Sequence, residues 1–307
     1  MKEKAKSIAT IAHDDVGKRD FSPSLTLWQR ALRRIRRDRP TMGAIVTLLV
    51  FALLSLLAPV ISDAFQVDPT TQDLRNNYAP LFAAGHPLGT DELGRDHLSR
   101  LLYGGQVSLG IALAAAVLSL GIGVAVGVFA GYYGGKVDDF IIWFVTTLTS
   151  IPSLFLLILI SALLSPSPFT LVLILGILSW TGTTRLVRSE AYAIKEREFV
   201  IAARAVGASN LRIMFLHIVP NMISLLIIDL SFQLGSLILA ESALSFVGFG
   251  IRAPMATWGN MLNGGLDYAR RAPHLVFLPG LLITTTVFCF FLLGDGLRDA
   301  FDPRISD

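Results

Sequence analysis

Six long apolar segments constrain what this chain of 307 residues can fold into. A helix needs about twenty mostly apolar residues to cross the hydrocarbon core of a bilayer. Charged residues make up only 16% of the chain, whereas soluble domains carry roughly one quarter, and the mean hydropathy is +0.61. The sequence therefore predicts an all-α integral membrane protein of about six transmembrane helices, at residues 42–61, 106–130, 139–164, 169–184, 221–247 and 275–296.

The arginines and lysines that flank these segments predict how the chain is oriented. Loops on the cytoplasmic side carry an excess of these residues close to the membrane. Arginines cluster at residues 33–39 and again between the fourth and fifth helices, whereas residues 62–105 and 248–274 carry few basic residues. We therefore expect external loops at those last two ranges and both termini in the cytoplasm.

The same boundaries define the domain organisation that we expect. The first apolar segment follows about forty polar residues and lacks a small-residue cleavage pattern, which indicates a retained anchor and not a removable signal peptide. Residues 1–27 are expected to form a mobile tail. In chain order, the first predicted parts are a basic cytoplasmic N-terminal segment (1–41), a first transmembrane helix (42–61) and an external loop (62–105). A transmembrane core domain (106–296) follows and contains a cytoplasmic loop (185–220). The last part is a cytoplasmic C-terminal tail (297–307).

Three glycines in the second predicted helix share one face. Gly123, Gly127 and Gly131 recur at every fourth position, so they present bare backbone along one side of the helix. A stripe of this kind lets a neighbouring helix approach closely in a membrane. We expect a tight helix pair there.

The segment between the fourth and fifth helices predicts two short helices joined at a glycine elbow. Residues 199–206 are rich in alanine and favour a helix, and Gly207 tolerates the left-handed conformation that follows a helix end. Ser209 or Asn210 can cap a second helix that leads to Pro220. Local chemistry leaves two interpretations open, a rigid element that fits against another protein or an amphipathic helix that rests on lipid headgroups.

Polar side chains inside the fifth apolar segment are candidates for function. An ionisable group is costly in lipid, so Asp229 should face the helix bundle or a water-filled path. Gln233 lies one turn further along and shares its face. Two interpretations of this pair stay open. The side chains line a transport pathway, or they form a hydrogen bond that joins two helices or joins the chain to a partner subunit. Glu241 is expected nearer the outer end, within reach of headgroup water.

The predicted external loop carries a charged motif just before the second helix. It contains Asp91, Glu92, Gly94, Arg95 and Asp96, without the paired spacing and apolar shielding that general acid–base chemistry needs. We expect a network of caps and salt bridges that holds the loop at the helix entrance. Docking of an external protein onto this face is the alternative, and the two are compatible.

Several kinds of site are missing from the sequence. No phosphate-binding loop of the form Gly-x-x-x-x-Gly-Lys-Ser/Thr occurs, so we expect no ATP hydrolysis at such a loop. The single cysteine, Cys289, excludes an intrachain disulfide and a metal site of several cysteines. We therefore predict no catalytic residue, no metal site and no enzyme activity of the chain by itself.

The elbow segment resembles the cytoplasmic signature loop of ATP-binding-cassette (ABC) importer permeases. The resemblance lies in an alanine pair, a glycine and a proline at the family's intervals, here Ala202, Ala203, Gly207 and Pro220. Ile201 stands where the family usually has an acidic residue, which puts a salt bridge to the ATPase at that position in doubt. Residues 86–96, 241–250 with Trp258, and 294–304 resemble further motifs of the dipeptide, oligopeptide and nickel permeases, in particular their C-type subunit.

This resemblance implies a type I ABC importer permease fold, with one extra N-terminal helix before a five-helix core, in a bacterial or archaeal inner membrane. It also implies four kinds of partner: a B-type permease, two cytoplasmic ATP-binding subunits, an external solute-binding protein and membrane lipid. ATP and Mg²⁺ would bind to the ATPase subunits and no cofactor to this chain. The residues that the resemblance assigns to ATPase coupling are Glu198, Ala202, Ala203, Arg204, Gly207, Ala208 and Pro220.

The expected function is a permease subunit that forms, with a second permease, the path for di- or oligopeptides. The same kind of permease for nickel or another small solute is an alternative. An ion-driven secondary transporter with Asp229 as the ion site is a third reading, but such transporters usually show repeated halves, and no internal repeat is found in this sequence.

Overall fold

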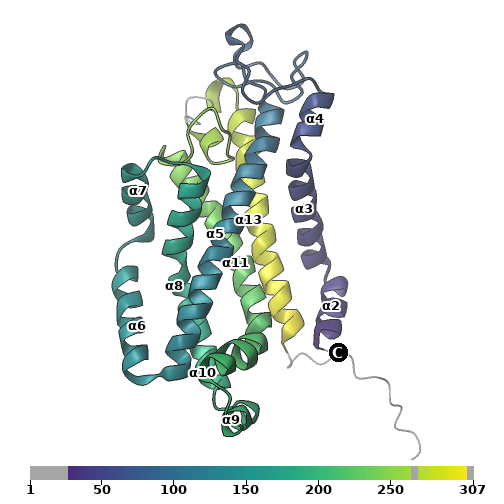
Figure 1. Ribbon diagram of the computed structural model, residues 1–307. Helices are drawn as coiled ribbons and strands as arrows, with labels where there is room; N and C mark the ends of the chain where they lie inside the picture. The colour runs from purple at the N-terminus through teal and green to yellow at the C-terminus, as the bar shows by residue number, and fades with distance from the viewer. Residues whose placement is uncertain (1–26, 264–268, 303–307) are drawn as a thin grey trace, which may run out of the picture.

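The computed structural model describes residues 27–263 and 269–302, and this part of the chain is helical with no β-strand. Figure 1 shows a bundle of long, roughly parallel helices with connecting loops gathered at one end. The helices are α2 (Leu27–Arg37), α3 (Arg39–Leu56), α4 (Ala58–Ala64), α5 (His97–Tyr133), α6 (Gly135–Thr149), α7 (Ser153–Leu163), α8 (Pro168–Ile194), α9 (Glu198–Ala205), α10 (Asn210–Arg212), α11 (Ile223–Phe246) and α13 (His274–Phe301).

The described residues contain five helices that are long and apolar enough to cross a membrane, and a sixth span if α6 and α7 are taken together. The prediction of one continuous helix over 139–164 is wrong. The chain bends by 77° between α6 and α7, because Pro152 has no N–H to continue the ladder and restricts Ile151 before it. The third predicted span is therefore a broken pair of shorter helices.

Several predicted boundaries are corrected by the structure. The second span begins at His97 and not at residue 106, so the loop predicted at 62–105 ends earlier. The fourth span continues to Ile194, and the last continues to Phe301, which shortens the predicted tail. The fifth span begins at Asn210 and runs to Phe246. Little of the loop predicted at 185–220 is irregular, because helix occupies both of its ends.

The α5 and α8 pair forms the tightest seam of the bundle and confirms the glycine prediction. A Cβ atom on Gly123 would lie 2.6 Å from Thr183 Cβ, and one on Gly127 would lie 2.8 Å from the Thr184 carbonyl oxygen. The Thr184 hydroxyl also donates to the Gly123 carbonyl at 3.4 Å. Only bare backbone permits this approach, so the glycine stripe determines the face of α5 against which α8 packs.

The two ends of the described chain meet at one end of the bundle. Arg34 Nη1 donates to the Asp302 carbonyl at 2.9 Å, and the Trp28 and Phe301 rings pack edge to face at 5.1 Å. Figure 1 places α9 and α10 at this same end, which we call the elbow end. The opposite, loop end carries residues 65–96 and 247–263. This arrangement agrees with the predicted sidedness, while the cytoplasmic location of the elbow end stays a prediction, and the tail predicted at 1–27 lies almost wholly outside the described residues.

Candidate functional site

The elbow has the local structure that the sequence predicts. Helix α9 ends at Ala205, and Gly207 takes a φ of +84°, the left-handed region that suits glycine. The Ala208 amide donates back to the Ala203 carbonyl at 3.1 Å, which closes the end of α9. Ser209 Oγ accepts from the Arg212 amide at 3.4 Å and caps α10. The chain therefore passes from α9 to α10 through a short turn at Gly207.

The elbow is attached firmly to the end of α5. Val200 on α9 is fully buried in a cluster that includes Val128 of α5 and Met214 beyond α10. The Tyr132 hydroxyl donates to Asn210 Oδ1 at 2.8 Å, and the Arg204 guanidinium lies 5.7 Å from the centre of the Tyr132 ring. A displacement of α9 would therefore be transmitted to α5 through these packed side chains.

The outward side of the elbow is a groove of about 470 Å³. Four small residues line it, and Val206, which also lines it, is 85% exposed. The small residues leave the backbone accessible beside an exposed apolar side chain. The residues that line this elbow groove are Phe199, Ala202, Ala203, Val206, Gly207, Ala208, Arg212 and His217.

Pro220 lies inside a helix and not at the mouth of one. A wide π-type turn over Ile213–Ile218 and a tight turn over Val219–Met222 join α10 to α11. Proline lacks the amide that would continue the ladder and clashes with the carbonyl four residues earlier, and the wide turn relieves that conflict. The elbow thus continues directly into the fifth span, which corrects the prediction of a separate second helix.

Asp229 joins α8 to α11 through a compact polar cluster. The Thr183 hydroxyl donates to Asp229 Oδ2 at 2.6 Å. Gln233 Nε2 donates to the same carboxylate oxygen at 2.7 Å and to Thr183 Oγ1 at 2.6 Å. Of the two interpretations of this pair, the hydrogen-bonded link between helices is present. A role of Asp229 and Gln233 in lining a pathway stays a prediction.

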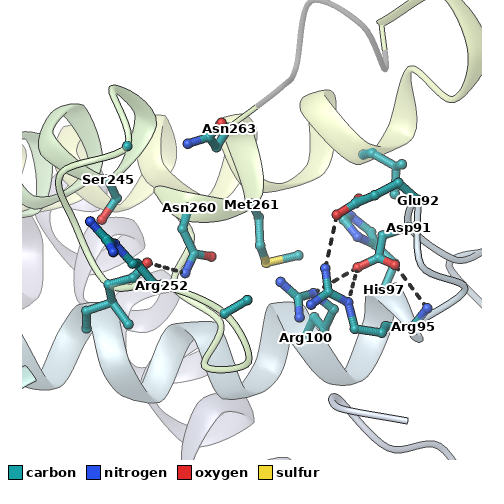
Figure 2. Close-up of a pocket in the computed structure, with 14 residues that line it drawn as sticks. Asp91, Glu92, Arg95, His97, Arg100, Ser245, Arg252, Asn260, Met261 and Asn263 are labelled. Carbon is teal, nitrogen blue, oxygen red and sulfur yellow. Dashed lines mark hydrogen bonds and ion pairs between the residues drawn. The ribbon is translucent and has the colours of Figure 1, made fainter. Parts of the chain in front are cut away.

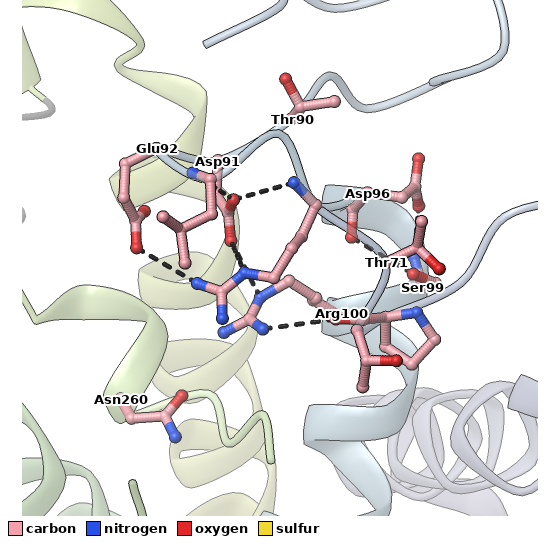
Figure 3. A network of polar contacts seen from close by, with 12 residues as sticks. Thr71, Thr90, Asp91, Glu92, Asp96, Ser99, Arg100 and Asn260 are labelled. Carbon is pink, nitrogen blue, oxygen red and sulfur yellow. Dashed lines mark hydrogen bonds and ion pairs between the residues drawn. The ribbon is translucent and has the colours of Figure 1, made fainter. Parts of the chain in front are cut away.

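The charged motif at the loop end forms the predicted network, shown in Figure 3. Asp91 Oδ2 lies 2.7 Å from Arg95 Nε and 3.3 Å from Arg100 Nε, with all three side chains buried. Its other oxygen accepts from the backbone amides of Leu93 and Arg95. Arg95 also reaches Glu92 at 3.1 Å. The Asp91 carboxylate is therefore shared by two buried guanidinium groups, and Glu92 supplies a second negative charge to Arg95.

Asp96 caps α5 and explains why that helix begins at His97. Its Oδ1 accepts from the Ser99 amide at 2.7 Å, and its Oδ2 lies 2.9 Å from His86 Nδ1. Gly94 has a φ of +72°, and a Cβ there would lie 1.8 Å from the Asp73 carbonyl oxygen. The motif thus combines a cap, ion pairs and an obligatory glycine. Docking of an external protein at this face stays a prediction.

A polar pocket of about 270 Å³ lies between this motif and residues 245–263. Figure 2 shows Asp91, Arg95 and Arg100 on one side and Arg252 and Asn260 on the other. The described residues include no cluster of three His, Cys, Asp or Glu side chains that could hold a metal ion. The pocket is therefore a charged depression of the loop end without a recognisable metal-ligand set.

Glu241 is the site residue whose environment the sequence did not reveal. The expectation that headgroup water solvates it is wrong, because its exposed fraction is 0%. Its carboxylate accepts from Ser245 Oγ at 2.8 Å and from Ser108 Oγ at 3.1 Å. The Trp258 amide donates to the same Ser108 oxygen at 3.1 Å. A carboxylate within an apolar run was the only local signal, and its partners come from distant parts of the chain.

Comparison with known proteins gives consistent matches over nearly the whole chain. Residues 123–307 match the family described as binding-protein-dependent transport system inner membrane component, and residues 26–80 match the N-terminal TM domain of oligopeptide transport permease C. The oligopeptide transport system permease protein OppC of Bacillus subtilis is 36% identical over 92% of this chain and 91% of that protein. The OppC of Escherichia coli is 37% identical over 91% and 92%. The dipeptide transport system permease protein DppC of Bacillus subtilis is 36% identical over 92% and 88%.

Proposed function

The chain belongs to the family of binding-protein-dependent transport system inner membrane components, and we propose that it is the C-type permease subunit of an ATP-driven peptide importer. The named relatives transport oligopeptides or dipeptides, and the match of residues 26–80 to the N-terminal part of an oligopeptide permease C supports the C-type assignment. The relatives are named as transport system permeases. Hydrolysis of ATP and binding of Mg²⁺ then belong to partner subunits.

The observation that carries the proposal is the elbow groove and its attachment to the bundle. Its lining includes Ala202, Ala203, Gly207 and Ala208, which admit a partner's side chains close to the backbone. The elbow packs against α5 and continues into α11, so movement of a bound ATPase would be transmitted to two spans. Glu198 and Arg204 lie on the exposed surface of α9 and supply charges for the same interface. Pro220 shapes the connection and does not face the partner in this scheme.

The complete transporter would contain a second, B-type permease, two ATP-binding subunits and an external solute-binding protein. The elbow end faces the cytoplasm in this arrangement, and both termini lie on that side. The loop end, with its charged motif and pocket, faces the solute-binding protein. Peptides pass between the two permeases.

Crosslinking tests the partner surface. In a Cys289→Ser background, a cysteine replaces Val206 in the elbow groove, and a matched control replaces Leu74, which is 66% exposed at the loop end. With co-expressed ATPase subunits, Val206→Cys should crosslink to an ATPase and Leu74→Cys should not. Equal yields, or crosslinks from Val206→Cys to lipid alone, would contradict the coupling role.

A glycine pair tests whether the elbow geometry couples hydrolysis to uptake. Gly207→Ala meets no atom within 4 Å but must hold a φ of +84°, a strain of about 1 kcal/mol or more for an L-residue. Gly110→Ala also has open space around it and lies within a helix. We expect Gly207→Ala to lower uptake of a labelled tripeptide relative to ATP hydrolysis, and Gly110→Ala to leave that ratio unchanged.

Competition by unlabelled peptide but not by Ni²⁺ would support the peptide assignment.

A further inference from the structure

The short helix α2 carries a basic surface at the elbow end. Arg33, Arg36 and Arg37 are exposed on it, and Arg39 follows at the start of α3. The contacts of Arg34 and Trp28 with the end of α13 hold α2 beside the bundle. The arginines are therefore kept at a defined place at the end of α3, as Figure 1 shows for α2.

Above this basic surface lies a groove of about 350 Å³ between α3, α5, α11 and α13. We call it the α3 groove. Its lining is almost wholly apolar, and Leu49 and Leu113 line it while remaining 63% and 53% exposed. The groove therefore opens to the surroundings of the bundle. Further lining residues are Ile45, Leu48, Ala52 and Phe290.

The separation of the two features fits one lipid molecule. Ile45 and Ala52 follow Arg39 on the same helix by six and thirteen residues, which places them about 9 to 20 Å along the axis from it. Half of a bilayer's hydrocarbon core is about 15 Å thick. A phosphate held at the level of the arginines would therefore extend an acyl chain to the depth of the groove.

We propose that α2 and the α3 groove together bind one anionic phospholipid, with the headgroup phosphate at Arg36, Arg37 and Arg39 and one acyl chain in the groove. The positive charge favours an anionic headgroup over a zwitterionic one. The apolar lining excludes polar groups, because an unpaired polar group there would lose its hydrogen bonds. The bound lipid fills the space between the extra N-terminal helix and the core, and so stabilises the position of α3.

The test uses the full chain in nanodiscs with photoreactive lipids whose diazirine lies near the middle of one acyl chain. Phosphatidylglycerol and phosphatidylcholine probes carry identical chains. We expect the phosphatidylglycerol probe to label peptides that contain residues 45–52 and 109–113, well above the phosphatidylcholine probe. Each arginine near an anionic headgroup contributes about fivefold in affinity, so Arg36→Gln with Arg37→Gln should reduce competition by unlabelled phosphatidylglycerol about 25-fold. Arg252→Gln, at the loop end, is the charge control.

A second pair of variants tests the groove itself. Ala52→Phe places a ring in the groove, and Ala114→Phe places the same ring at an exposed position of α5 that does not line it. The first should abolish labelling and the second should not. Equal labelling by both lipids would show ordinary bulk lipid and overturn the proposal. A crosslink from a photoreactive residue at position 49 to another permease chain, in place of lipid, would overturn it as well. None of these readouts depends on transport.

Discussion

The glycine stripe of α5 offers a test in which one substitution is made at two positions of one helix. Gly127→Ala puts a Cβ 2.8 Å from the Thr184 carbonyl oxygen and 2.8 Å from Val187 Cβ. Gly121→Ala, less than two turns away, meets nothing within 4 Å. Both changes gain the same helix propensity, about 1 kcal/mol. The difference between the two variants therefore isolates the close approach of α8.

The expected magnitude follows from the atoms that the new methyl group meets. One is a backbone carbonyl and the other is a β-branched side chain with little rotamer freedom, so neither can give way cheaply. Overpacking of a tight interior typically costs 1 to 3 kcal/mol. Gly121→Ala should thus be about 1 kcal/mol more stable than the unsubstituted chain, and Gly127→Ala about 1 to 3 kcal/mol less stable than Gly121→Ala.

The assay is thermal unfolding in one detergent at one heating rate. The quantity measured at each temperature is the fraction of protein that remains monodisperse. For a domain of this size, 1 kcal/mol corresponds to about 2 to 4 °C, so the two midpoints should differ by roughly 2 to 12 °C. Gly131→Ala, whose Cβ would lie 2.5 Å from the Arg188 carbonyl oxygen, should follow Gly127→Ala. If Gly127→Ala and Gly121→Ala unfold at the same temperature, the α5–α8 seam is not as close as described, and the reasoning from the glycine stripe fails.

Four further substitutions, at three positions, test the polar contacts; those at Asp91 and Glu241 are read by the same unfolding assay and the one at Asp229 by uptake. Asp91→Asn should cost about 3 to 5 kcal/mol, because two buried guanidinium groups lose their shared counter-charge; a loss below about 1 kcal/mol would mean that the network is hydrated and weak. Glu241→Gln keeps one acceptor oxygen and should cost about 1 kcal/mol, whereas Glu241→Ala also leaves a cavity and should cost about 3 kcal/mol. Asp229→Asn preserves an acceptor for the hydroxyl that it contacts, so uptake should stay near its unsubstituted level; complete loss of uptake would favour an ion-binding role over a link between helices.

The sequence reveals those features that depend on a few neighbouring residues. The lengths of the apolar runs predict the spans, because crossing a bilayer depends on local composition. The elbow at Gly207 was predictable for a similar reason, since an alanine-rich stretch, a glycine and a serine each act on the backbone within one turn. The close packing at Gly123, Gly127 and Gly131 was visible as a spacing, although the stripe alone did not identify α8 as the partner.

The break at Pro152 and the continuity across Pro220 show where local signals failed. Both sites contain a proline in an apolar setting. The chain bends by 77° at Pro152, whereas at Pro220 the helix continues through a wide turn. Proline removes a hydrogen bond in either case. The outcome depends on whether neighbouring elements hold the chain in line, and Met214 and Ile218 beside Pro220 are fully buried against α5 and α9.

Tertiary structure alone decided the polar contacts between distant segments. Ser108 meets Glu241 across 133 residues of chain, and Trp258 meets Ser108 across 150. Such pairs depend on the rotation and height of each helix relative to the next, to within a fraction of a turn, and hydropathy contains no information on either quantity. The sequence by itself therefore determined a membrane bundle with a rigid elbow at one end. Packing of the helices decided that Glu241 is buried, that Asp229 links α8 to α11, and that the elbow continues into the fifth span without a loop.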